Sequence, residues 1–314
     1  MQKIIQLVLN KNKLSADLPY TQYFGGQIND TYLIGDDYVL KVEKDLDVLK
    51  HQSEIVELGV RAGAKIPKII DSGIVEGKQY LLMEKIHGNK LSADWVSFTA
   101  SQKENLIAQI AEQLKILHSV HFKKYSPQRP REFDNFKDSL EYFTKTLTNF
   151  ITKENKTFDS RTTENIDFVS RYFDDNVSKL DETSTAVFVH NDLHFENIMY
   201  EDDTITGLID FDFSRQAPKD YELWHLVDFF NTPVYYVEQK LESMWEKYQL
   251  GNEIQLFKKY YPELFSHPDL STRLKLYFMD QIFSDLQWGA TDKFNQKVEQ
   301  YFKTDWLERV VVDN

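Results

Sequence analysis

Hydrophobic and polar residues follow two different periods along this chain. Up to about residue 86, short stretches of alternating apolar and polar residues predict strands: a strand, a turn and a second strand over 23–34, and a further strand over 38–42. A helix is predicted over 45–59, with Gly59 at its end. From Gly88 onward, apolar residues recur at every third or fourth position, which is typical of helices.

The first long helix of this second part opens with a capping box. Ser101 and Glu104 have the spacing that satisfies the free N–H groups of a first helical turn. His118 falls near the helix end, where a core or helix-dipole role is expected rather than metal binding. Further helices are predicted over 133–151, 163–179, 238–249, 252–260, 271–289 and 294–309.

These patterns predict an α+β fold with two lobes. A small lobe over 1–86 has an antiparallel sheet and one helix, and a larger, mainly helical lobe spans 87–314. Two of the predicted helices form an insertion over about 131–180.

A second group of short strands surrounds a polar loop. Residues 186–189 form a continuous apolar run, 198–200 a second short strand, and 205–209 a third, which ends at Asp210. The strand order takes the loop 190–197 and the tip after 209 to one edge.

This loop contains His190, Asp192 and Asn197 in the spacing H-x-D-x-x-x-x-N. In phosphoryl transfer, Asp192 would accept the proton of an attacking hydroxyl. Asn197 and Asp210 would hold Mg²⁺, because this ion binds few protein oxygens in addition to phosphate oxygens. An Asp and an Asn five positions apart are common in loops, but their placement between two short strands is much less so.

The small lobe offers candidates for phosphate contacts. Gly25 and Gly26 permit a tight turn whose backbone N–H groups can approach phosphate, although a plain hairpin is an equal alternative. Lys41 lies in an alternating strand, where a kinase lysine reaches the α- and β-phosphates and is held by a helix glutamate. We favour Glu54 as that partner over Glu43 and Glu57, and over a solvated lysine.

Together these segments resemble the aminoglycoside phosphotransferase and choline kinase superfamily, small-molecule kinases with a protein-kinase-like fold. The resemblance runs from about Tyr23 to Leu226 and includes the Gly-Gly-x-x-Asn turn that ends at Asn29, Lys41, 66–69, 81–88, Leu117-His118, 190–197 and 209–212. It implies ATP or GTP with Mg²⁺ as cofactors. It also implies nucleotide contacts from Gly25, Gly26, Asn29, Lys41 and the connector around Glu84 and Ile86.

Two departures from the family pattern matter. Glu222-Leu223 replaces the Asp-Leu pair that often follows the magnesium aspartate, and the longer carboxylate can still support the catalytic loop. Asp212 stands where protein kinases have the glycine of Asp-Phe-Gly. Only ten positions separate Asp212 from Glu222, too few for a long activation loop, so we expect no protein substrate.

Composition agrees with a soluble enzyme. The 314 residues are 41% apolar, and no stretch approaches the ~20 apolar residues of a membrane span. The segment 1–9 lacks a small-residue cleavage site, so no signal peptide is expected. The absence of cysteine excludes disulfides and thiolate metal sites and fits a cytoplasmic location.

The chain is acidic, with 50 acidic and 37 basic residues and a net charge of −13. This balance disfavours nucleic acid as a partner, since binding to phosphate backbones needs clustered Lys and Arg. It favours a cationic small molecule as the hydroxyl acceptor, although many proteins are acidic for solubility alone.

The C-terminal third is expected to face the acceptor. It contains Asp228, Asp280 and Asp285, which could pair with amino groups. It also contains rings that could hold a quaternary ammonium, although most are expected to be core: Tyr221, Trp224, Phe229, Phe230, Tyr235, Tyr236, Trp245 and Trp288.

Three functions stay open from sequence. The first is a kinase acting on a small cationic metabolite or an aminoglycoside. The second is a choline- or ethanolamine-type kinase, or another metabolite kinase for homoserine or a sugar. The third is a catalytically inactive, kinase-like nucleotide-binding protein, which the intact set of Lys41, Asp192, Asn197 and Asp210 disfavours.

Overall fold

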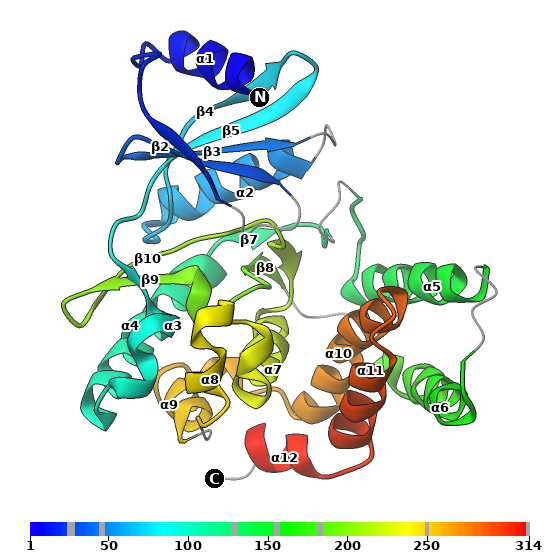
Figure 1. Cartoon of the computed structure of the whole chain (residues 1–314). Helices are drawn as coiled ribbons and strands as arrows, with labels where there is room; N and C mark the ends of the chain where they lie inside the picture. Colours follow the sequence, from blue (N-terminus) through cyan, green and yellow to red (C-terminus); the bar gives the residue numbers. More distant parts are fainter. Residues whose placement is uncertain are drawn as a thin grey trace.

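A computed structural model describes residues 1–23, 29–43, 48–126, 131–153, 158–180, 185–248 and 251–311. It has a small lobe built on an antiparallel sheet and a larger lobe that is mainly helical (Figure 1). The predicted α+β fold with two lobes is therefore confirmed. The lobe boundary after residue 86 stays a prediction.

The sheet of the small lobe has five strands in the order β1-β2-β3-β5-β4, all antiparallel. The strands are β1 (Tyr20–Tyr23), β2 (Asp30–Ile34), β3 (Tyr38–Glu43), β4 (Ile69–Val75) and β5 (Lys78–Glu84). The predicted strand, turn and strand over 23–34 is confirmed in its strands, although the first of them begins three residues earlier.

Two helices pack on this sheet. Helix α1 (Gln2–Lys11), which the sequence analysis did not predict, buries Ile5 and Val8 in one cluster with Leu40 and Val42 of β3. Helix α2 (Val48–Ala62) lies along the sheet beside β4 and β5 (Figure 1). Because side chains alternate along a strand, Lys41 points to the face opposite Leu40 and Val42.

The large lobe contains most of the helices. They are α3 (Leu91–Asp94), α4 (Ala100–His118), α5 (Phe136–Lys153), α6 (Ser160–Asn176), α7 (Glu222–Asn231), α8 (Glu242–Trp245), α9 (Glu253–Tyr260), α10 (Leu270–Gln287), α11 (Thr291–Lys297) and α12 (Trp306–Val311). The two helices predicted within about 131–180 are α5 and α6, and both pack on α10. That they form an insertion stays a prediction. No helix in the described ranges is long and apolar enough to cross a membrane.

Two small sheets complete the large lobe. One joins β10 (Thr204–Leu208), β9 (Ile198–Glu201) and β6 (Asn89–Lys90). The other joins β11 (Arg215–Ala217), β8 (Ala186–Val189) and β7 (His121–Phe122). The short strands predicted around the polar loop are therefore confirmed.

Several predicted helix ends are wrong. The capping box of α4 is formed by Thr99 and Gln102 instead of Ser101 and Glu104, because the helix begins two residues earlier. The predicted helix over 294–309 is divided into α11, a π-helical turn at 298–302, and α12.

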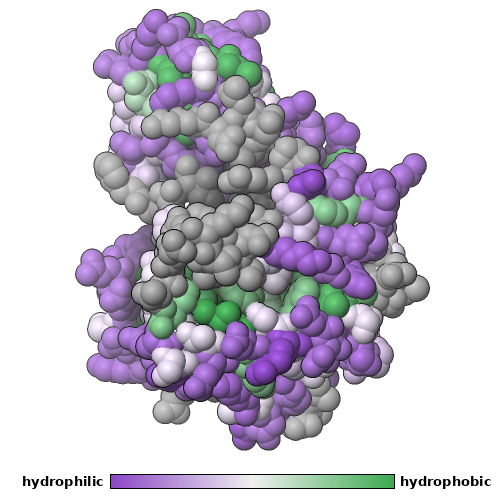
Figure 2. All heavy atoms as spheres, turned by 90° about the vertical axis from the view of Figure 1, so that its right-hand side faces the viewer, coloured by the Kyte–Doolittle hydropathy of each residue, from purple (hydrophilic) through white to green (hydrophobic). Residues whose placement is uncertain are grey.

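On the face seen in Figure 2, hydrophilic residues cover most of the described surface, with hydrophobic residues in small groups.

Gly59 lies inside α2 and does not end it. A Cβ at this position would lie 2.7 Å from Ile66 Cδ1 and 2.9 Å from Phe188 Cε1, both of which belong to the main core. The glycine is therefore needed for the close approach of α2 to the large lobe. The chain turns only at Gly63, which has a φ of +93°.

We expect Gly59→Val to lower the free energy of unfolding by about 1–3 kcal/mol, because overpacking outweighs the better helix propensity of valine. Chemical denaturation of the two proteins measures the difference. Glu57→Val introduces the same side chain on the exposed face of α2 and should change stability by only about 0.5 kcal/mol. Equal losses in the two variants would contradict the packing role of Gly59.

Candidate active site

The loop 190–197 and the segment after β10 are joined by backbone contacts. Ile209 donates its N–H to the carbonyl of Asn197 at 2.9 Å, and the His190 ring lies 2.9 Å from the carbonyl of Ile209 through Nε2. The structure therefore brings Asn197 and Asp210 to the same edge, as the strand order predicted.

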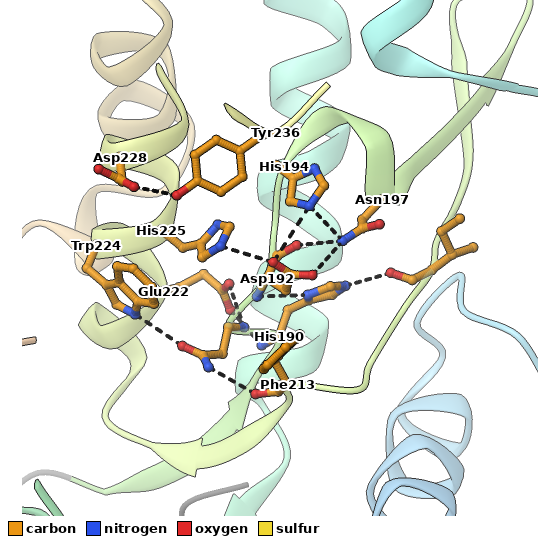
Figure 3. A network of polar contacts seen from close by, with 12 residues as sticks. His190, Asp192, His194, Asn197, Phe213, Glu222, Trp224, His225, Asp228 and Tyr236 are labelled. Carbon is orange, nitrogen blue, oxygen red and sulfur yellow. Dashed lines mark hydrogen bonds and ion pairs between the residues drawn. The ribbon is translucent and has the colours of Figure 1, made fainter. Parts of the chain in front are cut away.

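Asp192 is held from both carboxylate oxygens (Figure 3). The side-chain amide of Asn197 donates to Oδ2 at 3.0 Å. On the other oxygen, His225 Nε2 lies 3.0 Å from Oδ1 and His194 Nε2 lies 3.6 Å away. The carboxylate is thus fixed in orientation, while its side chain retains 19% of its exposure.

This environment keeps Asp192 ionised. Burial works to raise the pKa of its carboxyl, but the imidazoles of His194 and His225 outweigh that effect and hold the pKa well below its ordinary value. An ionised carboxylate that is fixed and partly exposed can accept a proton from a hydroxyl that reaches it.

Helix α7 lies beside the loop and supports it from that side (Figure 3). At its first residue, the fully buried carboxylate of Glu222 accepts the backbone N–H groups of His190 at 2.8 Å and Asn191 at 3.2 Å. One turn later, His225 reaches Asp192. The structure thus agrees with the expectation that the longer carboxylate can support the loop.

Glu222 is also tied to the core. The His118 ring lies 3.5 Å from it through Nε2 and 3.0 Å from the hydroxyl of Tyr261 through Nδ1. Burial works to raise the pKa of the Glu222 carboxyl, but contacts to His118 and His190 hold it below its ordinary value of 4.5. The core role expected for His118 therefore takes the form of support for this carboxylate.

Two residues next to the candidate catalytic groups have left-handed backbone conformations. Asn191 has a φ of +60° and Asp210 a φ of +64°, values that favour glycine. Side-chain contacts hold Asn191 there: its amide donates to the carbonyl of Phe213 at 3.0 Å, and its amide oxygen accepts from Trp224 Nε1 at 3.1 Å. Local strain of this kind persists only where the surroundings enforce it.

Lys41 connects the small lobe to this edge. Its ammonium donates to Asp210 Oδ1 at 2.7 Å and to Asp212 Oδ1 at a shorter distance. Burial works to lower the pKa of Lys41, but the two carboxylates raise it well above its ordinary value, so the residue stays charged. Lys41 also holds the pKa of the Asp210 carboxyl below its ordinary value against the effect of burial.

The predicted pairing of Lys41 with Glu54 is wrong in this structure. Glu54 is exposed on α2, and the helix residue that reaches the site is Gln52, which is 3% exposed. Residues two positions apart in a helix point about 200° apart, so both cannot face the same site. Glu43 is buried on the same strand as Lys41, and Glu57 is exposed and pairs with Arg61, whereas Lys41 pairs with Asp210 and Asp212.

The other predicted nucleotide contacts have mixed outcomes. Gly25 and Gly26 lie outside the described residues. Asn29 is 7% exposed and donates to Asp212 Oδ2 at 2.5 Å. In the connector, the N–H of Glu84 donates to the carbonyl of Lys68 at 2.8 Å, and Ile86 packs over Gly207. Adenine contacts near Glu84 and Ile86 stay a prediction.

The oxygens near Asp210 are suited to Mg²⁺. The Asp210 side chain is 39% exposed, and the Asn197 amide that donates to Asp192 leaves its oxygen for other partners. Within the described ranges, no group of three or more His, Asp and Glu side chains could hold a metal by itself.

Two of the three acidic residues expected to face an acceptor, Asp228 and Asp285, do not do so. Asp228 is fully buried and accepts from Lys297 at 2.9 Å and from Tyr301 at 2.6 Å. Asp285 is 6% exposed and lies 3.5 Å from the same lysine. The Asp280 side chain lies outside the described residues. Because a buried charge needs a buried partner, these aspartates serve the core.

Most of the predicted ring cluster is core as well. Phe229 and Trp245 are buried against Phe195 of the catalytic loop. Tyr236 differs, because its ring packs against those of His194 and His225. In contrast, Tyr235 is 56% and Trp288 83% exposed.

Sequence analysis missed three residues that contact the acids of the site: His194, His225 and Gln52. His194 lies inside the recognised loop, so its position was a usable signal. His225 follows Glu222 by three residues, which places both on one face of a helix. Gln52 carried no signal, because its role depends on the exact start of α2.

A family model matches most of the chain. A model of the phosphotransferase enzyme family (APH) matches residues 20–248. A search among curated proteins finds no match.

Solved structures of aminoglycoside phosphotransferases are similar in fold. A thermostable mutant of APH(4)-Ia, in ternary complex with ADP and hygromycin B, has a TM-score of 0.69 at 16% identity, and 99% of each chain is covered. The gentamicin–APH(2'')-IIa complex has a TM-score of 0.64 at 19% identity, with 96% of this chain and 95% of that chain covered. ADP-bound APH(2'')-Ib has a TM-score of 0.59 at 18% identity, with 99% and 97% covered.

Replacing Glu222 tests the support of the catalytic loop. We expect Glu222→Gln to lower the free energy of unfolding by roughly 2–3 kcal/mol, because the introduced amide turns a donor toward groups that also donate. The folded pKa of Glu222 is depressed, so its contribution is complete above about pH 4.5 and is lost as pH falls through the folded pKa. Denaturation from pH 7 to pH 3 should show the difference between the two proteins shrinking below pH 4.5.

The control is Glu201→Gln, which makes the same change at the exposed end of β9. It should alter stability by less than about 0.5 kcal/mol at every pH. A Glu222→Gln effect of that size, or one that grows as pH falls, would contradict the assigned role.

Proposed function

Because the chain belongs to the phosphotransferase enzyme family, we propose that it is a small-molecule kinase that transfers the γ-phosphoryl group of ATP or GTP to a hydroxyl of a small acceptor. The observation that carries this proposal is the Asp192 carboxylate, which is ionised, fixed from both oxygens and partly exposed. Glu222 and Asp228 are also fixed by their partners but are fully buried, so the partial exposure of Asp192 is what leaves it open to an acceptor hydroxyl.

In the proposed reaction, Asp192 accepts the proton of the acceptor hydroxyl. The hydroxyl oxygen then forms a bond to the γ-phosphorus, and the bond between that phosphorus and the bridging β-oxygen breaks, which releases the nucleoside diphosphate. Asn197 keeps Asp192 in place throughout this step. Lys41 would pair with the phosphates of the nucleotide, as its charge and position support.

Asn197 and Asp210 would hold Mg²⁺, which when bound neutralises charge on the phosphate oxygens. Gly25, Gly26, Asn29 and the connector at Glu84 and Ile86 complete the proposed nucleotide contacts. The complexes of related folds with ADP support an adenine nucleotide.

For the acceptor we propose a cationic molecule of the aminoglycoside type. The solved complexes with hygromycin B and gentamicin support this class, and so does the net charge of −13. A choline-type acceptor has weaker support, because most rings expected to form a cage are core residues such as Phe229 and Trp245.

A phosphate-transfer assay tests the function directly. The purified protein is incubated with Mg²⁺ and either ATP or GTP across aminoglycosides, choline, ethanolamine, homoserine and sugars, and phosphorylated product is measured by mass. We expect product with at least one amine-bearing acceptor. Nucleotide binding without any product in the panel would instead favour a catalytically inactive binding protein.

Replacing the candidate base should abolish turnover. Asp192→Asn preserves size but removes the proton acceptor, so the turnover number should fall by roughly 10²–10⁴. Calorimetric titration should give a nucleotide dissociation constant within about threefold of the parent, since Asp192 is not proposed to bind nucleotide. A turnover number within threefold of the parent would contradict the assignment of Asp192 as the base.

Asp210→Ala should affect the metal instead. We expect it to remove the Mg²⁺-dependent part of the thermal stabilisation by nucleotide, because the site loses its only proposed carboxylate ligand. Melting curves with nucleotide, with and without Mg²⁺, measure this effect in Asp210→Ala and in Asp192→Asn. Equal metal-dependent shifts in the two variants would show that the ligand roles are misassigned.

A further inference from the structure

Lys41 has two carboxylate partners, and they differ in exposure. The Asp210 side chain is 39% exposed, while that of Asp212 is 9% exposed. Both belong to the segment that follows β10, on opposite sides of Phe211. Only the exposed one belongs to the proposed Mg²⁺ ligands, so the buried one has a different task.

Asp212 is held by donors from three separate segments of the small lobe. Its Oδ1 accepts from Lys41 of β3 and from Gln52 Nε2 of α2, the latter at 2.9 Å. Its Oδ2 accepts from Asn29, just before β2, at 2.5 Å. All three donors are less than 8% exposed. Asp212 therefore joins a loop of the large lobe to β2, β3 and α2 at one point.

Helix α2 offers no carboxylate to Lys41. Kinases hold the corresponding lysine with a glutamate from a helix of the small lobe. In this chain the two acids of α2, Glu54 and Glu57, are both exposed to solvent. The helix residue directed at the site is the neutral Gln52, which can donate to a carboxylate but cannot neutralise an ammonium. The negative charges beside Lys41 therefore come from Asp212 and Asp210, and neither belongs to α2.

We propose that Asp212 is the positioning residue for Lys41, and that it replaces the helix glutamate by joining the lysine to α2 through Gln52. This inference rests on the proposed function, since it concerns how the nucleotide site is assembled. Asp210 can then turn to the metal while Lys41 keeps a fixed, buried counter-ion. Charge-assisted hydrogen bonds in a buried site hold such a geometry more firmly than an exposed ion pair would.

The test is a double-mutant cycle read by nucleotide binding. Asp212→Asn removes the charge and keeps the size, and Gln52→Glu introduces a carboxylate beside the same oxygen that contacts Lys41. Isothermal titration with Mg·ATP and Mg·GTP gives the dissociation constants, and melting without nucleotide reports folding. Glu54→Gln tests the competing assignment, in which Glu54 of the same helix is the partner of Lys41.

We expect Asp212→Asn to weaken nucleotide binding by about tenfold, since it removes a charged hydrogen-bond partner of Lys41. Gln52→Glu alone should also weaken it, because two carboxylates then repel each other. In the Asp212→Asn protein, however, Gln52→Glu should strengthen binding to within about threefold of the parent. Gln52→Glu would thus weaken binding in the parent and strengthen it in Asp212→Asn. Such opposite effects are expected if a carboxylate at either position can serve as the counter-ion of Lys41.

Three outcomes would overturn the inference: additive effects of the two changes, binding within twofold of the parent for Asp212→Asn, or a loss with Glu54→Gln as large as that with Asp212→Asn. If Asp212→Asn unfolds, Gln52→Met removes only the donor from α2 and should still weaken binding by a few fold. Normal binding by Gln52→Met would then reject the inference. Failure of the parent itself to bind either nucleotide would instead overturn the proposed function.

Discussion

The buried carboxylate of Glu222 is the constraint on which the candidate site depends. A charge with no exposure is tolerated only where hydrogen bonds and a partner surround it, and here the backbone N–H groups of His190 and Asn191 and the ring of His118 do so. Because two of these groups belong to the catalytic loop, the loop cannot move without leaving the charge unsatisfied. The position of the Asp192 carboxylate is therefore set by the same hydrogen bonds that satisfy the buried charge of Glu222.

In the small lobe, too, a buried charge is held by partners from a segment near the candidate site. There the charge is that of Lys41, and Asp212 and Asp210 surround it. Each lobe thus fixes one short segment of the large lobe: α7 holds the loop before β9, and α2 holds the segment after β10. The hydrogen bond from the Ile209 N–H to the Asn197 carbonyl joins the two segments. Contacts from both lobes therefore hold the edge that contains Asn197 and Asp210.

Motif spacing and alternation were enough to predict the two lobes, the strands around the loop and the grouping of Asp192, Asn197 and Asp210. These features depend on local sequence, since strand period and loop position fix them. The Lys41 partner was not predictable in the same way. The rotation of α2 about its axis decides whether Gln52 or Glu54 faces the site, and here the buried face contains Gln52, Ile55 and Val56. Gly59 was misread for a related reason, because a glycine can serve close packing as well as a helix end.

Burial also changes what the acid excess means for an acceptor. Asp228 and Asp285 share Lys297 in the core, and Asp220 accepts from Arg273 at 2.6 Å. Such acids are internal counter-ions whose field is largely cancelled by their partners. Exposed charges act over only about 8–10 Å at physiological salt, so an acceptor is selected by groups close to Asp192 more than by the net charge. The rings of His194, His225 and Tyr236 pack against one another beside Asp192, so under the proposed function they are groups that an acceptor would meet.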